Sequence, residues 1–129
     1  MIKGLFRVIL PVACIDKASA FYSAMFDEPG ERVSPGRHYF QCGGTVLALY
    51  DPKADGDEIG AGWSMHENQY FYFSVSDLES IFERAKDAGA DIQGDIEAMP
   101  WGERLFYAND PFGNPICFVD EETLFMGTA

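Results

Sequence analysis

The sequence has few basic residues, few cysteines and few histidines, and each shortage excludes a class of function. Nine Lys and Arg stand against twenty-one Asp and Glu, a net charge of −12, which opposes nucleic-acid binding because that needs a basic footprint. Three cysteines and two histidines, with no Cys-x-x-Cys pair, argue against a disulfide framework and a structural zinc site. The acidic balance would attract cationic ligands, or would serve solubility alone.

No apolar run is long enough to span a bilayer, so no membrane partner is expected. The apolar segment Val8–Ala13 follows the basic Lys3 and Arg7, and such a segment is compatible with a strand or with the core of a signal peptide. Pro11 and the helix signal at Asp16 favour a strand in a mature protein. We therefore expect a cytoplasmic protein.

Two stretches have the pattern of amphipathic helices. Asp16 is predicted to cap the first helix, which stops at Asp27-Glu28-Pro29-Gly30. Ser76 begins a capping box that predicts the second helix, which ends at Gly89. Each helix has one apolar stripe with i, i+3, i+4, i+7 spacing. The stripes consist of Ala18, Phe21, Tyr22 and Met25 in the first helix and of Leu78, Ile81, Phe82 and Ala85 in the second.

Each helix is preceded by one strand-like run and followed by three, so the chain is predicted to repeat one β-α-β-β-β module. The modules are expected at about 1–52 and 69–122, with a linker at about 53–68. One module alone could not bury its apolar sheet face, so a single domain with a joint core is expected over 1–129. The expected strands are Leu5–Ala13, Glu31–Val33, Arg37–Gln41, Thr45–Asp51, Tyr70–Val75, Asp91–Ala98, Glu103–Ala108 and Asn114–Val119.

Two stretches resemble a known superfamily. The first, from Leu10 to Tyr22, is a strand, a turn and a helix carrying Phe-Tyr. The second joins Trp101-Gly102-Glu103-Arg104 to Asp110-Pro111-Phe112-Gly113-Asn114, where Gly113 and Asn114 tolerate left-handed backbone. These stretches resemble the vicinal oxygen chelate superfamily of glyoxalases, bleomycin-resistance proteins and extradiol dioxygenases. The resemblance implies an α+β fold in which two βαβββ modules form a curled eight-stranded sheet, an open cup with helices outside that binds a small molecule.

Many enzymes of this superfamily hold a divalent metal with histidine and glutamate from the first and last strand of each module. Counting back from the helix starts, the first-strand positions fall on Arg7 and Tyr70, and the last-strand positions on Ala48 and Cys117. Arginine has no acceptor atom, and a methyl, a phenol and a lone thiol do not form a divalent-cation site. The resemblance therefore implies a member without the usual metal ligands, and we assign neither a catalytic residue nor a cofactor.

Three candidate ligand-binding residues lie on the first strands of the modules. Arg7 could anchor an anionic group of a ligand, or could pair with an acid such as Glu103. Tyr70 and Tyr72 alternate with phenylalanines, so they could line the cup with flat apolar rings and polar tips, or could pack in the core.

Four further candidates lie in loops and later strands. Cys117 could be a nucleophile, or an inert buried thiol because no histidine lies near it in the sequence. His38 has general-base chemistry on an expected strand, or a structural role. Trp63 in the linker and Trp101 in the hairpin turn could stack on a planar or cationic ligand. Trp63 could instead belong to a lid or a dimer contact, and Trp101 could be structural.

The leading hypothesis is a homodimeric glyoxalase/bleomycin-resistance-like protein that binds or sequesters a small organic molecule in the cup. One alternative is a metal-dependent glyoxalase-like lyase, isomerase or dioxygenase, with a non-standard site drawn from His38, His66, Asp51 or Asp120. The other is a protein-interaction module whose open sheet edges are closed by a partner or a second copy. The sequence leaves open whether the modules pair within one chain or swap between two.

Overall fold

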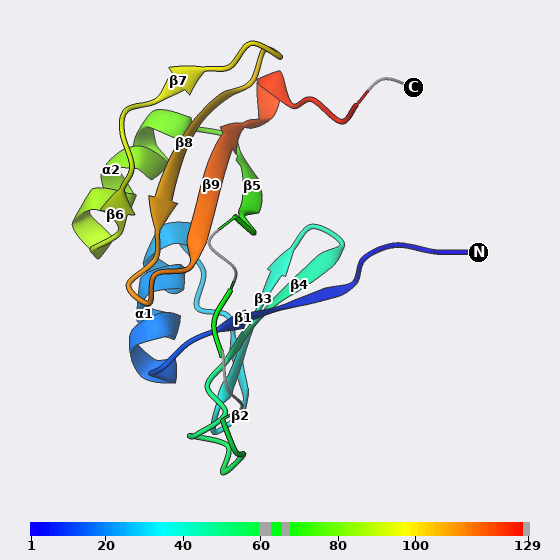
Figure 1. The fold of residues 1–129 in the computed structure, drawn as a ribbon, viewed down its shortest axis with the longest axis vertical. Coiled ribbons are helices and arrows are strands. Elements are labelled where there is room, and N and C mark those ends of the chain that lie inside the picture. The colour runs from blue at the N-terminus through cyan, green and yellow to red at the C-terminus, as the bar shows by residue number, and fades with distance from the viewer. Residues whose placement is uncertain (60–62, 66–67, 128–129) are drawn as a thin grey trace. The chain divides into compact units, whose positions relative to one another are not determined.

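The computed structural model describes residues 1–59, 63–65 and 68–127. It contains two α-helices and two mixed sheets, and this confirms the expected α+β class. The chain divides into two compact units, 1–65 and 66–129, coloured from blue to green and from green to red in Figure 1. The joint core and the curled eight-stranded sheet stay predictions.

Unit 1 has a four-stranded sheet with the order β1-β4-β3-β2 and one helix. β1 and β4 are parallel, and the other neighbouring strands are antiparallel. The helix connects the first two strands in sequence. The elements are β1 (Arg7–Pro11), α1 (Ile15–Phe26), β2 (Glu31–Ser34), β3 (Arg37–Cys42) and β4 (Thr45–Tyr50).

Unit 2 repeats this order with one strand interrupted. β5 and β9 are parallel, and β8 is antiparallel to β9, β6 and β7. The single strand expected over Asp91–Ala98 is two short strands that pair with opposite ends of β8, because Gly94 has a φ of 112° and leaves the extended conformation. The elements are β5 (Phe71–Val75), α2 (Leu78–Ala88), β6 (Asp91–Ile92), β7 (Glu97–Ala98), β8 (Arg104–Asn109), β9 (Pro115–Asp120) and the 3-10 helix η1 (Glu121–Thr123).

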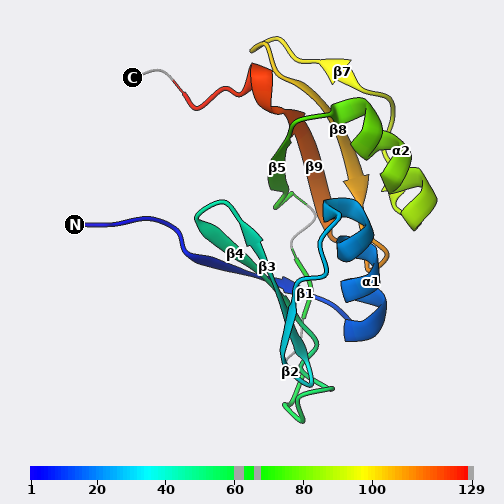
Figure 2. The same cartoon turned by 180° about the vertical axis from the view of Figure 1, so that it is seen from behind.

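Each sheet has one face covered by its own helix. In unit 1, Phe26 of α1 packs edge-on against Phe40 of β3. In unit 2, Phe82 of α2 packs edge-on against Phe106, which stacks on Phe118. Figures 1 and 2, seen from opposite sides, show α2 along one face of its sheet. Because side chains alternate along a strand, the intervening residues lie on the other face, which we call the helix-free face.

The start of α1 is held by a residue distant in sequence. α1 begins at Ile15, with Cys14 as an N-cap that makes no side-chain hydrogen bond. The prediction that Asp16 caps this helix is therefore wrong, since Asp16 lies in the first turn. Instead, Asp51, which follows β4, accepts a hydrogen bond from the backbone N–H of Ile15 at 3.2 Å. The last residue of the helix is Phe26, and Asp27 follows as a C-cap in the left-handed conformation, at the start of the predicted Asp27–Gly30 stop.

The cap of α2 is local. Asp77, one residue after the predicted Ser76, is the N-cap and accepts a hydrogen bond from the N–H of Ser80 at 3.1 Å. Gly89 ends the helix with a φ of 93°, which confirms the predicted stop. The two helices have 12 and 11 residues, and over the described ranges no helix has the length and apolar character needed to cross a membrane.

The Asp110–Asn114 turn is stabilised by the Asp110 side chain. Its Oδ1 accepts hydrogen bonds from the N–H of Phe112 at 2.8 Å and of Asn114 at 2.9 Å. Its Oδ2 accepts one from the Asn114 amide at 2.9 Å. Gly113 has a φ of 82°, as expected, whereas Asn114 does not use the left-handed region. Asn114 therefore stabilises the turn through hydrogen bonds and not by adopting the left-handed backbone conformation.

Replacing Asp51 with alanine is expected to destabilise the protein. Asp51 is buried, at 6% exposure, and it also accepts a 3.3 Å bond from the N–H of Ala54, so alanine leaves two backbone donors without this acceptor. The free energy of unfolding should fall by about 1–3 kcal/mol. Urea denaturation of the full chain at neutral pH measures this change.

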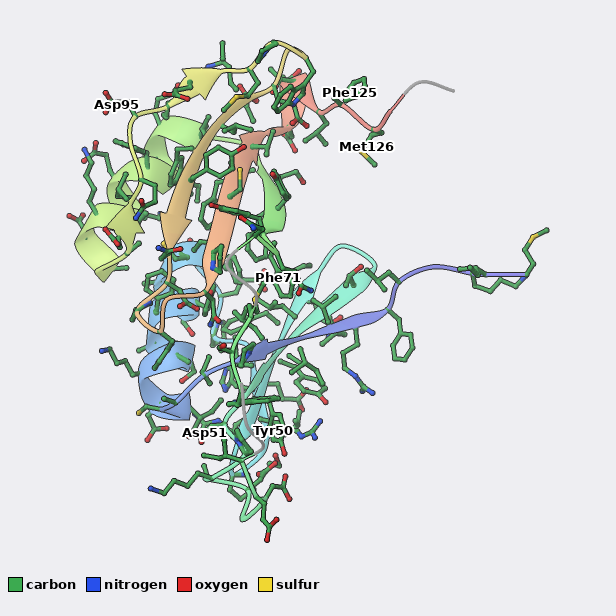
Figure 3. The ribbon with its side chains drawn as sticks, in the orientation of Figure 1. Tyr50, Asp51, Phe71, Asp95, Phe125 and Met126 are labelled. Carbon is green, nitrogen blue, oxygen red and sulfur yellow. The ribbon has the colours of Figure 1, made fainter. Side chains whose placement is uncertain are left out.

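Asp95→Ala is the matched control, because it removes the same charge from an exposed loop position. Figure 3 labels both side chains. The Asp95→Ala change should alter the free energy of unfolding by no more than about 0.5 kcal/mol. Equal unfolding free energies for the two variants would contradict the capping role of Asp51.

Candidate functional site

The helix-free face of unit 2 brings together three of the sequence-predicted residues. β5 and β9 pair in parallel with Tyr72 opposite Cys117, and Tyr70 lies two residues before Tyr72. β8 adds Tyr107, which pairs with Cys117 from the other side. Tyr70 and Tyr107 both pack against the buried group that contains Cys117. The structure thus forms a compact site from residues far apart in the chain.

Three tyrosine rings cover this face, and we call Tyr70, Tyr72 and Tyr107 the tyrosine cluster. The Tyr70 and Tyr107 ring centroids are 5.2 Å apart, and Tyr72 lies 6.3 Å from Tyr70 and 6.5 Å from Tyr107. Tyr72 is 56% exposed, so it presents its ring to solvent. The buried floor consists of Leu105, Cys117 and Val119, with Met99 packed against it.

Two groups on this face, Cys117 and Tyr107, have raised pKa values. Burial, with a smaller contribution from the negative charge of Glu103, raises the pKa of the Cys117 thiol to about 12. Burial and the neighbouring Tyr72 hydroxyl raise the pKa of Tyr107. Cys117 is therefore a protonated thiol, unsuited to nucleophilic attack or to binding a metal as thiolate. What the cluster offers a ligand is apolar ring surface and phenol hydroxyl groups.

Tyr107 is not among the ligand-binding residues predicted from the sequence, although the alternation of its strand indicates its position. Leu105 and Tyr107 alternate with Phe106 and Ala108 along β8, so they share one face. Pairing of β8 with β9 as a hairpin then places Tyr107 beside Cys117. The alternation was visible in the sequence, but the register that joins it to Cys117 was not.

Arg7 and Ala48 lie on the helix-free face of unit 1. β1 and β4 pair with Ile9 opposite Ala48, and Arg7 lies two residues before Ile9 on the same face. Arg7 is exposed, with its guanidinium carbon 5.3 Å from the Phe6 ring centroid. Among the residues that the structure describes, Arg7 forms no ion pair. Its cation is therefore available to an anionic group.

His38 lies on the other face of the same sheet. It is opposite Leu49 and 8% exposed. Its Nδ1 accepts a hydrogen bond from Nε of Arg32 at 3.2 Å, and its Nε2 lies 2.8 Å from the carbonyl oxygen of Pro29. Because Nδ1 is an acceptor, Nε2 carries the proton and donates a hydrogen bond to the carbonyl oxygen of Pro29. Both ring nitrogens are thus used inside unit 1, on the face away from Arg7.

The two tryptophans contact partners within their own units. Trp63 packs edge-on against Tyr50, with ring centroids 5.3 Å apart, and is 37% exposed. Trp101 lies in the turn between β7 and β8, where its indole N–H donates to Glu103 at 2.7 Å. Both rings keep exposed surface, but neither is shown to join the tyrosine cluster.

The start of the expected linker is attached to unit 1. Asp55 accepts hydrogen bonds from the Ser34 hydroxyl at 3.0 Å and from the N–H of Gly36 at 2.5 Å, and it pairs with Arg37 at 3.5 Å. The Tyr50 hydroxyl donates to Asp57. The start of the segment expected as a linker is therefore bonded to unit 1.

The glyoxalase/bleomycin resistance protein/dioxygenase superfamily model matches residues 4–118. The chain belongs to this superfamily. Metallothiol transferase FosB of Shouchella clausii (strain KSM-K16) is 31% identical over 118 residues, which cover 88% of this chain and 77% of the relative.

Solved structures share the fold at lower identity. A glyoxalase-related enzyme from Fulvimarina pelagi has a TM-score of 0.75 at 19% identity, over 98% of this chain and 94% of that one. Lactoylglutathione lyase from Agrobacterium tumefaciens has a TM-score of 0.69 at 21% identity, over 92% of this chain and 93% of that one. At these identities the likeness establishes the fold alone.

Three of the residues that the sequence predicts at the superfamily's metal-ligand positions, Arg7, Ala48 and Cys117, offer no donor to a divalent cation. The guanidinium of Arg7 has no lone pair to donate, Ala48 has only a methyl group, and the thiol of Cys117 is held protonated. Over residues 1–59, 63–65 and 68–127, no group of three or more His, Cys, Asp or Glu side chains could hold a metal ion. His66, a candidate for a non-standard site, lies outside these ranges.

Cys117 is expected to resist alkylation at a pH where an ordinary thiol reacts. An unperturbed thiol ionises near pH 8.5, so its alkylation accelerates strongly between pH about 7 and 9, and Cys14 is the exposed cysteine used for comparison. Because its pKa is raised to about 12, Cys117 should stay protonated and react at least about a hundredfold more slowly. Iodoacetamide labelling followed by peptide mass spectrometry measures both rates.

Labelling in denaturant is the control, since unfolding should make both cysteines react alike. Similar rates for Cys14 and Cys117 in the native protein at pH about 9 would contradict the buried, protonated thiol.

Proposed function

We propose that this protein is a superfamily member without the usual metal ligands, and that it binds or sequesters a small organic molecule in the cytoplasm. The observation that carries the proposal is the chemistry at the four ligand positions, which hold Arg7, Ala48, Tyr70 and Cys117. Where a metal would need imidazole and carboxylate, unit 2 has the Tyr70 phenol and the protonated thiol of Cys117, with Tyr107 packed against the same buried group. Such a surface suits a ligand held by ring contact and hydrogen bonds.

The ligand class follows from the side chains available. Tyr70, Tyr72 and Tyr107 favour a planar or aromatic molecule with hydrogen-bond acceptors for their hydroxyls. The net charge of −12 favours a cationic group on the ligand. On unit 1, the unpaired Arg7 favours an anionic group. Cationic, anionic and zwitterionic aromatic compounds are therefore the classes to test.

A metal-dependent activity is the second candidate function. It is favoured by the relative named metallothiol transferase, at 31% identity, and by the lactoylglutathione lyase with the same fold. This activity could be that of a transferase, lyase, isomerase or dioxygenase. It requires metal ligands other than the side chains at the four predicted ligand positions. A protein-interaction role is the third candidate function, and it predicts that no small molecule binds.

Thermal melting of chelator-treated full-length protein separates these functions. One series carries manganese, iron, nickel or zinc, and the other a panel of cationic, anionic and zwitterionic aromatic compounds. A ligand at about a hundred times its Kd stabilises by about 2.7 kcal/mol, a rise of several degrees in Tm. We expect the rise with organic compounds only. A rise with a metal alone would overturn the proposal in favour of the metal-dependent enzyme, and no rise in either series would favour the interaction role.

Tyr72→Ala is expected to weaken binding of the compound that raises Tm most. Its ring is the most exposed of the tyrosine cluster, so alanine removes contact area with little loss of core packing. The Kd should rise roughly tenfold, equivalent to about 1.4 kcal/mol. Isothermal titration calorimetry measures the Kd, and Tyr72→Phe, which keeps the ring, is the control. An unchanged Kd in Tyr72→Ala would place the ligand elsewhere.

A further inference from the structure

Glu103 places a carboxylate on the same sheet face as the tyrosine cluster. It directly precedes β8, and its carbonyl oxygen accepts a hydrogen bond from the N–H of Met99 at 2.8 Å, so the pairing of β7 with β8 continues to this residue. Because side chains alternate along a strand, Glu103 shares its face with Leu105 and Tyr107. Its negative charge also contributes to the raised pKa of the Cys117 thiol on the neighbouring strand. Glu103 therefore lies at the edge of the tyrosine cluster, within unit 2.

Two hydrogen bonds fix the Glu103 side chain. Its Oε1 accepts from the Trp101 indole N–H at 2.7 Å, and its Oε2 accepts from the backbone N–H of Phe125 at 2.9 Å. An ionised carboxylate has about four lone-pair sites, so each oxygen can accept a further hydrogen bond. Glu103 is half-buried, and the Trp101 ring beside it is 48% exposed. A group from solvent can therefore reach a carboxylate that is already held in position beside an aromatic ring.

Among the residues that the structure describes, no cation forms an ion pair with Glu103. The adjacent Arg104 lies on the helix-covered face of the sheet, where it forms ion pairs with Glu79 and Asp120. Glu97 of β7 adds a second, exposed carboxylate to the helix-free face. The helix-free face of unit 2 is thus an aromatic surface beside negative charge, and both features favour a cation.

We propose that Glu103 selects a cationic ligand for the tyrosine cluster, an elongated molecule with an aromatic ring at one end and an ammonium or amidinium group at the other. The ring contacts the tyrosine cluster, and the cation donates hydrogen bonds to Glu103 beside the Trp101 ring. Glu103 and Tyr107 are four residues apart on one strand, about 13 Å between Cα atoms, so a spacer must join the two groups of the ligand. This selection rests on the proposed ligand-binding function and narrows the ligand to the cationic class.

Two compounds of nearly equal shape test the selection. Naphthylbutylamine is cationic at neutral pH, and naphthylbutanol is neutral. Isothermal titration calorimetry of the full chain is expected to give a Kd roughly tenfold lower for the amine, because its hydrogen bonds to Glu103 are charge-assisted.

Glu103→Gln keeps the size of the side chain and removes its charge. It should reduce the preference for the amine to about twofold or less, by weakening amine binding alone. The Kd of the alcohol should change by less than about twofold, which establishes that the variant keeps its fold and its aromatic surface. Glu83→Gln is the matched control, because it makes the same change in net charge on α2, which covers the opposite face, and it should keep the roughly tenfold preference.

Equal Kd values for the amine and the alcohol in the native protein overturn the charge selection and leave the ligand-binding function in place. A preference for the amine that survives Glu103→Gln, or that Glu83→Gln reduces to the same extent, overturns the role of Glu103. Binding of neither compound also overturns the selection, and the ligand-binding function fails with it only if no organic compound raises Tm.

Discussion

In each unit the first and last strands are parallel neighbours, and most of the structure depends on that pairing. Parallel strands need a crossover connection, and in each unit α1 or α2 lies on that connection. The helix covers one face of the sheet, so alternation assigns every strand residue either to the helix or to the helix-free face. A slip of one residue would exchange the two sets. The registers Ile9–Ala48 and Tyr72–Cys117 therefore decide which side chains can form a site.

The two units use one register for different chemistry. Equivalent positions hold a methyl in unit 1 and a thiol in unit 2, at Ala48 and Cys117. The aspartate three residues after each of these positions also has a different role. Asp51 caps α1, whereas Asp120 forms an ion pair with Arg104 at 3.0 Å. Packing against the helix restricts the residues of the covered face in both units, whereas the helix-free face, although partly buried, does not have to match a helix. One superfamily scaffold can for this reason carry a metal centre, an aromatic surface or a docking face.

Patterns that act over a few residues were readable from the sequence, and errors arose where a distant residue or the backbone angle of a glycine decided the structure. The stripes of both helices and the Gly89 stop were predicted because spacing and positive φ are local requirements. The cap of α1 was assigned to Asp16, since no local signal shows that β4 ends beside the helix and supplies Asp51. The strand over Asp91–Ala98 was predicted unbroken because Gly94 does not reveal its φ in the sequence.

By itself the sequence determined the α+β class, the repeated module and the superfamily resemblance. Those follow from periodicity, turn chemistry and motif spacing, which tolerate small errors in register. Only the tertiary structure decided which candidates lie together. Tyr107 lies with Tyr70 and Tyr72 beside Cys117, and His38 lies on the helix side of its sheet, hydrogen-bonded to Arg32 and Pro29. Strand pairing and burial set these outcomes, and both join residues whose separation in the chain carries no local signal.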